Sequence, residues 1–167
     1  LQMAAERGAV CYMASQPMEG FALPCLSVTD VRKAQSLAAQ WFYDQPSASL
    51  TLIGITGTKG KSTTTCMTHE VMNALAGRRT GLLSGVEHYV GSDVELPHLT
   101  TPESLDFQHM LALIRDNGLG IATTEISSQA YQVSRVYGEH FDFGVFLNIG
   151  PDHISEREHP TMEDYLA

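Results

Sequence analysis

The chain has 167 residues, about the size of one to one-and-a-half ordinary domains, which excludes a large multidomain enzyme within this stretch. Hydrophobic residues make up 43% and charged residues 17%, a composition typical of a folded globular protein rather than a disordered one. The net charge of −9 repels polyanions, so we expect no nucleic-acid partner and no binding to a membrane surface.

The lack of a targeting signal in this sequence and the pattern of its cysteines predict a reducing compartment. The sequence has no apolar run of membrane-spanning length and no charged-then-apolar leader, so we expect a cytoplasmic protein. Its three cysteines form no CxxC pair and are expected to be small core residues. Because it begins at Leu1 and stops at Ala167 within a predicted helix, we expect a fragment cut at both ends.

The first third of the chain is predicted to contain two short strands and two helices. After an initial helix, apolar strands are predicted over 9–13 and 23–28, and Asp30 is suited to cap a helix over 31–42. Small polar residues around Pro46 have the composition of a linker. We therefore predict a domain boundary there, between residues 1–46 and residues 47–167.

Strands and helices then alternate along the chain. A strand over 50–55 leads through a glycine-rich turn into a helix that ends at Gly77. Thr101 is predicted to cap a second helix, with Pro102 at its first position. Further apolar strands are predicted over 119–124 and 143–149. This alternation predicts an α/β fold, a P-loop type parallel sheet with helices on both faces.

The clearest chemical signal is the segment 57–62, Gly-Thr-Lys-Gly-Lys-Ser, between a predicted strand and a predicted helix. It is a variant of the GxxxxGK[ST] phosphate loop that lacks the first glycine of the pattern. Gly57 and Gly60 allow the backbone to approach phosphates, Lys61 can reach the β- and γ-phosphates, and Ser62 can ligate magnesium. The alternative is a glycine-rich turn with a solvated lysine, which this context disfavours.

The loop and three further blocks carry a family resemblance. Residues 56–62 resemble the nucleotide loop of the Mur ligases of peptidoglycan synthesis, and the other blocks agree in order and spacing: 99–103 (LTTPE), 125–138 (EISSQ to RVYG) and 141–165. Together they most resemble the MurE branch, which adds the third stem-peptide residue to UDP-N-acetylmuramoyl-L-alanyl-D-glutamate. The resemblance implies that residues 1–46 end the N-terminal UDP-substrate-binding domain. It also implies that residues 47–167 begin the central ATP-binding domain, and that the C-terminal domain is absent.

The resemblance also implies a mechanism. ATP phosphorylates the substrate carboxylate, the amino group of the incoming amino acid attacks the acyl phosphate, and a tetrahedral intermediate releases phosphate; magnesium neutralises charge. The implied ATP-binding residues are Gly57, Thr58, Lys59, Gly60, Lys61, Ser62 and Thr63. Relatives carry a carbamylated lysine that would fall about two residues beyond Ala167. We therefore expect no turnover by this chain alone.

Further site residues follow from matching motif positions. The implied catalytic residues are Lys61, Glu125 and His153, and the implied magnesium ligands are Ser62, Glu125 and His153. Without the resemblance, Glu125 would be read as a solvated strand end and His153 as a loop or capping residue. A carboxylate and an imidazole suit magnesium when phosphate oxygens complete its shell.

The substrate-binding residues implied by the resemblance are Thr100, Thr101, Ser127 and Arg135. Hydroxyls and a guanidinium suit the carboxylates and pyrophosphate of a UDP-muramoyl-dipeptide. Two of these residues have structural alternatives, because Thr101 could serve as a helix cap and Arg135 as a surface ion pair. The other substrate would be an amino acid, with L-lysine favoured over meso-diaminopimelate, and the full-length enzyme is expected to be monomeric.

Other interpretations remain open or are disfavoured. A non-catalytic nucleotide-binding remnant and a folylpolyglutamate synthase-like ligase are the alternative functions. The segment 69–73, HEVMN, lacks the second histidine of a zinc motif and is predicted to be ordinary helix surface. A serine hydrolase built on Ser127 or Ser128 lacks the GxSxG elbow, and the spacing of His140 and His159 does not favour zinc.

Overall fold

The computed structural model describes residues 1–92, 94–151 and 160–166. The helices are α1 (Gln2–Glu6), α2 (Val31–Phe42), α3 (Lys61–Ala76), α4 (Ser104–Asp116), α5 (Ser128–Gln132) and α6 (Met162–Leu166), with a 3-10 turn η1 (Pro46–Ser49). The strands are β1 (Tyr12–Ala14), β2 (Cys25–Ser27), β3 (Thr51–Thr56), β4 (Gly81–Leu83), β5 (His88–Tyr89), β6 (Val94–Glu95), β7 (Ile121–Glu125) and β8 (Phe143–Phe146).

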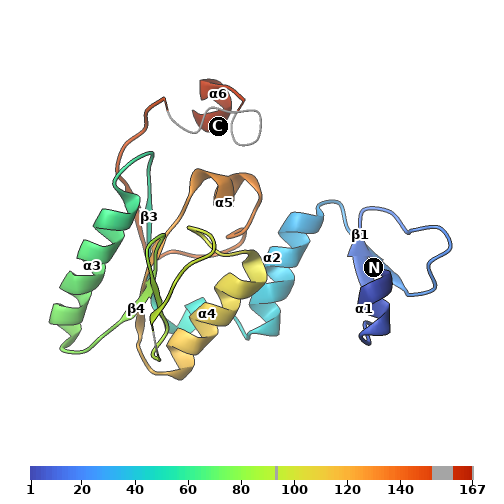
Figure 1. The fold of residues 1–167 in the computed structure, drawn as a ribbon, viewed down its shortest axis with the longest axis horizontal. Helices are drawn as coiled ribbons and strands as arrows, with labels where there is room; N and C mark the ends of the chain where they lie inside the picture. Colours follow the sequence, from blue (N-terminus) through green and yellow to red (C-terminus); the bar gives the residue numbers. More distant parts are fainter. Residues whose placement is uncertain (93, 152–159, 167) are drawn as a thin grey trace.

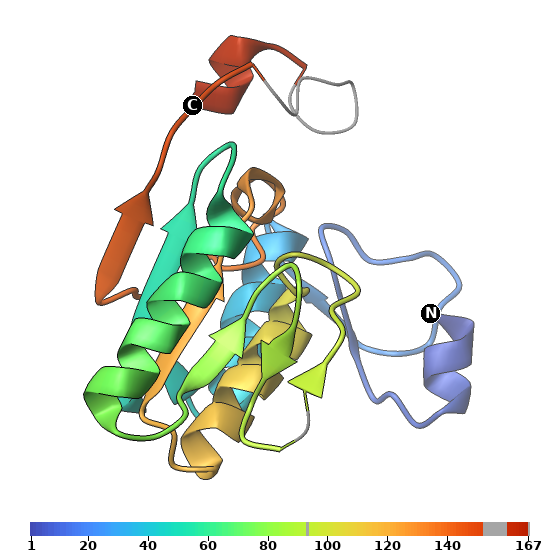
Figure 2. The same cartoon turned by 60° about the vertical axis from the view of Figure 1, so that its left-hand side comes forward.

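The centre of the molecule is a six-stranded sheet in the order β6-β5-β4-β7-β3-β8. Strands β4, β7, β3 and β8 run parallel, whereas β5 and β6 add an antiparallel edge. Helix α3 covers one face, and α4, with α2 packed against it, covers the other (Figures 1 and 2). The predicted α/β sheet with helices on both faces is confirmed, and the antiparallel edge was not predicted.

The core lies between the sheet and α4. The apolar residues of α4 that share a helical face, Phe107, Leu111 and Ile114, are fully buried. They pack with Leu52 of β3 and with other sheet residues in one cluster. At Gly81 an added Cβ would lie 2.6 Å from Cδ1 of Ile114, so only glycine lets the helix lie this close to β4. This packing holds α4 against β3 and β4.

The first 45 residues form a smaller part of the molecule. Strands β1 and β2 pair in parallel as a separate two-stranded sheet, away from the central sheet in Figure 1. Helix α2 begins after Asp30, whose Oδ1 accepts from the backbone N–H of Lys33 at 3.0 Å, so the predicted cap is confirmed. Ser36 and Gln40 of α2 donate to the carbonyl of Tyr137 at 2.9 and 2.7 Å, which ties α2 to the segment after α5.

Several local predictions were wrong. Helix α4 begins at Ser104 with Glu103 as its N-cap residue, so neither Thr101 nor Pro102 starts it. The cysteines are exposed (Cys11) or half-buried (Cys25 and Cys66) rather than core residues. Strands β4, β5 and β6 went unpredicted because strands of two or three residues are too short to show a pattern.

The interpretation of 69–73 as ordinary helix surface was wrong for His69, which is 1% exposed, whereas Val71 is 54% exposed as a surface residue. Its Nδ1 lies 3.2 Å from Oγ1 of Thr80 and its Nε2 lies 3.1 Å from Nδ2 of Asn73. Oγ1 of Thr80 donates to Oδ1 of Asn73 at 2.9 Å, so Thr80 must accept from Nδ1–H of the imidazole. The neutral Nδ1–H tautomer therefore satisfies this buried network, which joins α3 to the start of β4.

Candidate active site

The phosphate loop connects the carboxyl end of β3 to the amino end of α3. Gly57 has φ of 141° and Gly60 has φ of 84°, backbone conformations that favour glycine. A Cβ on Gly57 would lie 3.1 Å from the backbone N and O of Asn148, so the loop also passes close to the chain after β8. The loop therefore leads directly into the amino end of α3, and a helix amino end of this kind can bind phosphate.

The chain after β8 holds the loop in place. The backbone N–H of Thr58 donates to the carbonyl of Asn148 at 3.0 Å. The amide side chain of Asn148 accepts from Lys59 N at 3.0 Å and donates to Lys59 O at 2.9 Å. Oγ1 of Thr58 accepts from Gly150 N at 3.0 Å and lies 2.7 Å from the hydroxyl of Tyr165 in α6. Asn148 was not predicted as a site residue. Its position directly after a strand that pairs with β3 could have identified it.

Lys61 is held across the loop. Its Nζ donates to the carbonyls of Gly57 at 2.9 Å and Thr58 at 3.1 Å. These contacts keep the ammonium group over the loop, where phosphate oxygens could replace carbonyl oxygens as its acceptors. Thr63 follows in the first turn of α3.

Glu125 ends β7 and is 3% exposed. Its Oε2 accepts from the backbone N–H of Gly85 at 2.8 Å. A Cβ built on Gly85 would lie 3.2 Å from this Oε2, 3.4 Å from Oγ of Ser62 and 3.5 Å from Cγ2 of Thr100. Gly85, which was not predicted, thus marks the point where two predicted metal ligands converge. Hydroxyl and carboxylate oxygens are ligands that Mg²⁺ prefers, so the residues present fit this ion.

Thr101 and Ser127 support the segment behind Glu125. Oγ1 of Thr101 donates to the carbonyl of Glu125 at 2.9 Å and accepts from the backbone N–H of Ser127 at 2.9 Å. Ser127 caps α5 by accepting from Ala130 N at 3.2 Å. Thr101 is fully buried and holds two loops together in place of the predicted helix cap.

One cavity of about 190 Å³ brings most predicted site residues together. It is lined by Lys61, Leu99, Thr100, Glu125, Ser127, Ser128, Gln129 and Arg135. His153 lies outside the described residues. The cavity combines two cations, a buried carboxylate and several hydroxyls at the carboxyl ends of parallel strands, where ligands bind in open α/β sheets.

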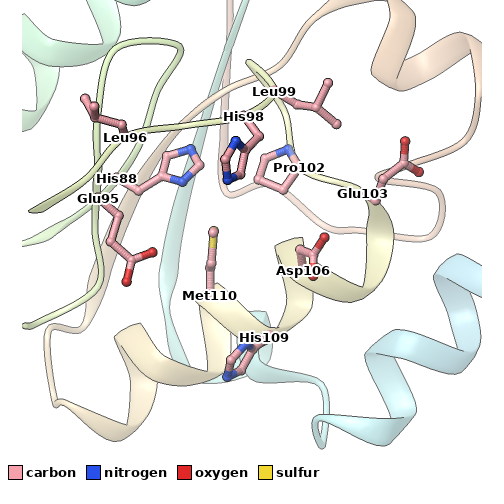
Figure 3. Close-up of a pocket in the computed structure, with 10 residues that line it drawn as sticks. All are labelled: His88, Glu95, Leu96, His98, Leu99, Pro102, Glu103, Asp106, His109 and Met110. Carbon is pink, nitrogen blue, oxygen red and sulfur yellow. The ribbon is translucent and has the colours of Figure 1, made fainter.

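A second cavity of about 280 Å³ lies between the β5–β6 hairpin and α4 (Figure 3). It is lined by His88, Glu95, Leu96, His98, Leu99, Pro102, Glu103, Asp106, His109 and Met110. His88 is 4% exposed, and burial lowers its pKa below the ordinary value. Its Nε2 has no hydrogen-bond partner within the part of the chain that the structure describes. Leu99 lines both cavities, so the segment 99–103 separates them.

The described ranges contain neither a membrane-spanning helix nor a ready-made metal cluster. No helix there is long and apolar enough to cross a bilayer. The same ranges contain no cluster of three or more His, Cys, Asp or Glu side chains arranged to hold a metal ion.

Curated proteins of known name are similar to almost the whole of this chain. A UDP-N-acetylmuramyl-tripeptide synthetase of Bifidobacterium longum is 48% identical over 168 residues, covering 96% of this chain and 32% of the relative. A UDP-N-acetylmuramoyl-L-alanyl-D-glutamate–L-lysine ligase of Enterococcus faecalis is 43% identical over 167 residues, covering 99% of this chain and 33% of the relative. The chain thus spans about a third of the length of these relatives.

The fold and the family agree as well. A solved structure of a UDP-N-acetylmuramoyl-L-alanyl-D-glutamate–2,6-diaminopimelate ligase superposes with a TM-score of 0.77 at 24% identity, covering 98% of this chain and 32% of that one. This likeness supports the fold. The family model of the Mur ligase middle domain matches residues 55–167, the part that contains most of the central sheet and the candidate site. The chain therefore belongs to the Mur ligase family.

Proposed function

We propose that this chain is the nucleotide- and substrate-binding part of a MurE-type ligase, which joins an amino acid to UDP-N-acetylmuramoyl-L-alanyl-D-glutamate. The observation that supports this most is that Lys61 of the phosphate loop, Glu125 and Arg135 line one cavity. Such a ligase needs an ammonium group to bind phosphates, a carboxylate to bind a metal ion and a guanidinium to bind an anionic substrate.

In the proposed reaction, a substrate carboxylate oxygen attacks the γ-phosphorus of ATP and ADP leaves. The amine nitrogen of the amino acid then attacks the acyl carbon, and phosphate leaves as the amide bond forms. Lys61 and the N–H groups at the amino end of α3 bind the phosphates and offset the charge that develops during transfer. Thr100, Ser127 and Arg135 orient the substrate carboxylate in the cavity.

Ser62 and Glu125 are the residues that would hold magnesium, which when bound neutralises charge on the phosphates. The Gly85 N–H fixes one oxygen of Glu125, so the carboxylate has a defined orientation before any ion arrives. His153 is proposed as the third ligand on the strength of the motif alone. A cytoplasmic location also belongs to the proposal, because ATP drives the reaction.

The division of the chain into residues 1–46 and 47–167 is part of the same proposal. In favour of the first boundary, residues 1–45 contain their own two-stranded sheet. We also propose L-lysine as the added amino acid. The support is the 43% identity with an enzyme named for L-lysine, against 24% with a structure named for diaminopimelate.

Calorimetric titration tests the proposal directly. The chain should bind ADP more tightly with Mg²⁺ than without it, and should bind UDP-N-acetylmuramoyl-L-alanyl-D-glutamate but not folate. No ADP should form when ATP, the dipeptide substrate and an amino acid are supplied together to this chain alone. Sequencing the gene across both ends should show a lysine about two residues beyond Ala167. A stop codon there would favour a nucleotide-binding remnant.

A further inference from the structure

Glu103, the residue before α4, joins two arginines from distant parts of the chain. Its Oε1 accepts from Nε of Arg135 at 3.0 Å and lies 2.9 Å from Nη2 of the same guanidinium. Its Oε2 accepts from Nη1 of Arg32, on α2, at 2.9 Å. The Arg135 side chain is 9% exposed, whereas that of Arg32 is 55% exposed. The carboxylate therefore serves as counter-charge mainly to a cation that has little access to water.

The remaining donors of Arg135 suit an anionic ligand. A guanidinium carries five N–H groups. Two of them engage Glu103, and one on Nη1 donates to the carbonyl of Thr101 at 3.3 Å. The described residues give no contact for the other two, and Arg135 lines the cavity below the phosphate loop. Two N–H groups on one planar fork can bind a carboxylate or a phosphate at two points.

Glu103 also keeps Arg135 from a competing partner. Glu125 lines the same cavity and is buried, and a mobile arginine there would be drawn to its carboxylate. Among the described residues Glu125 forms no ion pair, and its Oε2 accepts from Gly85 N instead. Because Glu103 neutralises Arg135, the guanidinium of Arg135 and the carboxylate of Glu125 do not pair with each other in the cavity.

We infer that Glu103 is a positioning residue, which holds Arg135 so that its two remaining N–H groups bind a carboxylate of the UDP-linked substrate. The inference rests on the proposed function, in which Arg135 contacts that substrate. Figure 3 shows Glu103 at the start of α4, apart from the histidine rings of the second cavity. Its part in the first cavity is thus exerted through Arg135.

The test uses Glu103→Gln, which keeps the shape of the side chain and removes its charge. We expect the ¹⁵N–¹H signal of Arg135 Nε to shift and to exchange faster with solvent. The affinity for UDP-N-acetylmuramoyl-L-alanyl-D-glutamate should fall about tenfold, while that for Mg-ADP stays unchanged. Asp116→Asn is the matched control, because it removes an exposed carboxylate 2.8 Å from Nε of the half-buried Arg115, and should change neither affinity.

Two further variants keep the test decisive. Arg32→Ala removes only the exposed partner and should leave the Arg135 signal in place. Glu103→Asp retains the charge and should recover part of the lost affinity; it also replaces Glu103→Gln if that variant does not fold. An unchanged Arg135 signal or an unchanged substrate affinity in Glu103→Gln overturns the inference. If the unaltered chain binds neither Mg-ADP nor the UDP-linked substrate, the proposed function itself fails.

Discussion

The carboxylate of Glu125 is buried, and among the described residues it accepts one hydrogen bond, from the backbone N–H of Gly85. A buried carboxylate without a paired cation is costly, and such groups in clefts mark functional sites. In the proposed function a magnesium ion compensates this charge when nucleotide binds. The site therefore depends on the negative charge of the Glu125 carboxylate rather than on the shape of the side chain.

Glu125→Gln tests that dependence. The amide retains an oxygen to accept from Gly85, so the fold should be kept, but the charge that attracts Mg²⁺ is gone. We expect the gain in ADP affinity on adding Mg²⁺ to shrink at least roughly tenfold, measured by calorimetry with and without the ion. A variant that keeps the full magnesium effect would remove Glu125 from the metal site.

Gly85→Ala tests whether the site needs the space that the missing side chain of Gly85 leaves. The new methyl would lie 3.2 Å from Oε2 of Glu125 and 3.4 Å from Oγ of Ser62, closer than comfortable contact. We expect weaker Mg-dependent ADP binding by this variant. Gly144→Ala is the matched control, because the space around Gly144 in β8 is open, and it should bind as the unaltered chain does. Equal affinities for the two variants would contradict the role of Gly85.

The sequence identifies which charged residues form this site better than it identifies how they are arranged in space. Lys61, Glu125 and Arg135 carry charges within motif blocks and lie together as a shared site requires. Gly85 could not be identified in the same way, because its contribution is the absence of a side chain at a point defined only by the tertiary fold. Asn148 supports the loop through contacts about 90 residues away in sequence, which local patterns do not reveal.

At the scale of elements, α2, α3 and α4 follow directly from apolar spacing and end signals. Strands β5 and β6 contain two residues each, and they depend on pairing, β5 with β4 and β6 with β5, rather than on their own sequence. The start of α4 was also misplaced, because Thr101 fits the pattern of a cap but bonds to Glu125 and Ser127 instead. Tertiary hydrogen bonds overrode a local preference there.

The cap of α2 gives a quantitative test. Asp30→Ala removes the acceptor of Lys33 N and should lower the free energy of unfolding by about 1 kcal/mol. Asp30→Asn keeps a side-chain oxygen in the same place and should cost much less, since the ion pair to Lys33 is exposed and long at 4.0 Å. Denaturant unfolding of the three proteins measures both changes. Equal losses in the two variants would mean that charge, not capping, is the stabilising feature.

For the whole molecule, two buried histidines link stability to pH. Burial lowers the pKa of His69 and of His88 below the ordinary 6.5. The unfolded chain therefore binds more protons than the folded chain just below pH 6.5, and stability is lost as the pH falls through that region. Protonated His69 would also present N–H to the amide group of Asn73, which breaks the network with Thr80.

We expect the midpoint temperature of thermal unfolding to decrease as the pH is lowered from 7.5 to 5.5. This range lies above the ordinary pKa values of most carboxylates. In His69→Gln/His88→Gln the fall should be smaller, even if this double variant is less stable at pH 7.5. Differential scanning calorimetry across the range provides the comparison. A slope that survives both substitutions would place the titrating groups elsewhere.

The strand order carries a consequence for the time course of folding. Strand β3, which leads into the phosphate loop, has no partner next to it in sequence: Ile53 pairs with Thr123 of β7 and with Phe143 of β8. During synthesis the first half of the chain therefore leaves the ribosome with β3 unpaired on both edges. Non-local parallel pairing of this kind is intrinsically slow and leaves apolar edges open. Nucleotide binding by a growing chain should thus begin only after residue 146 has emerged.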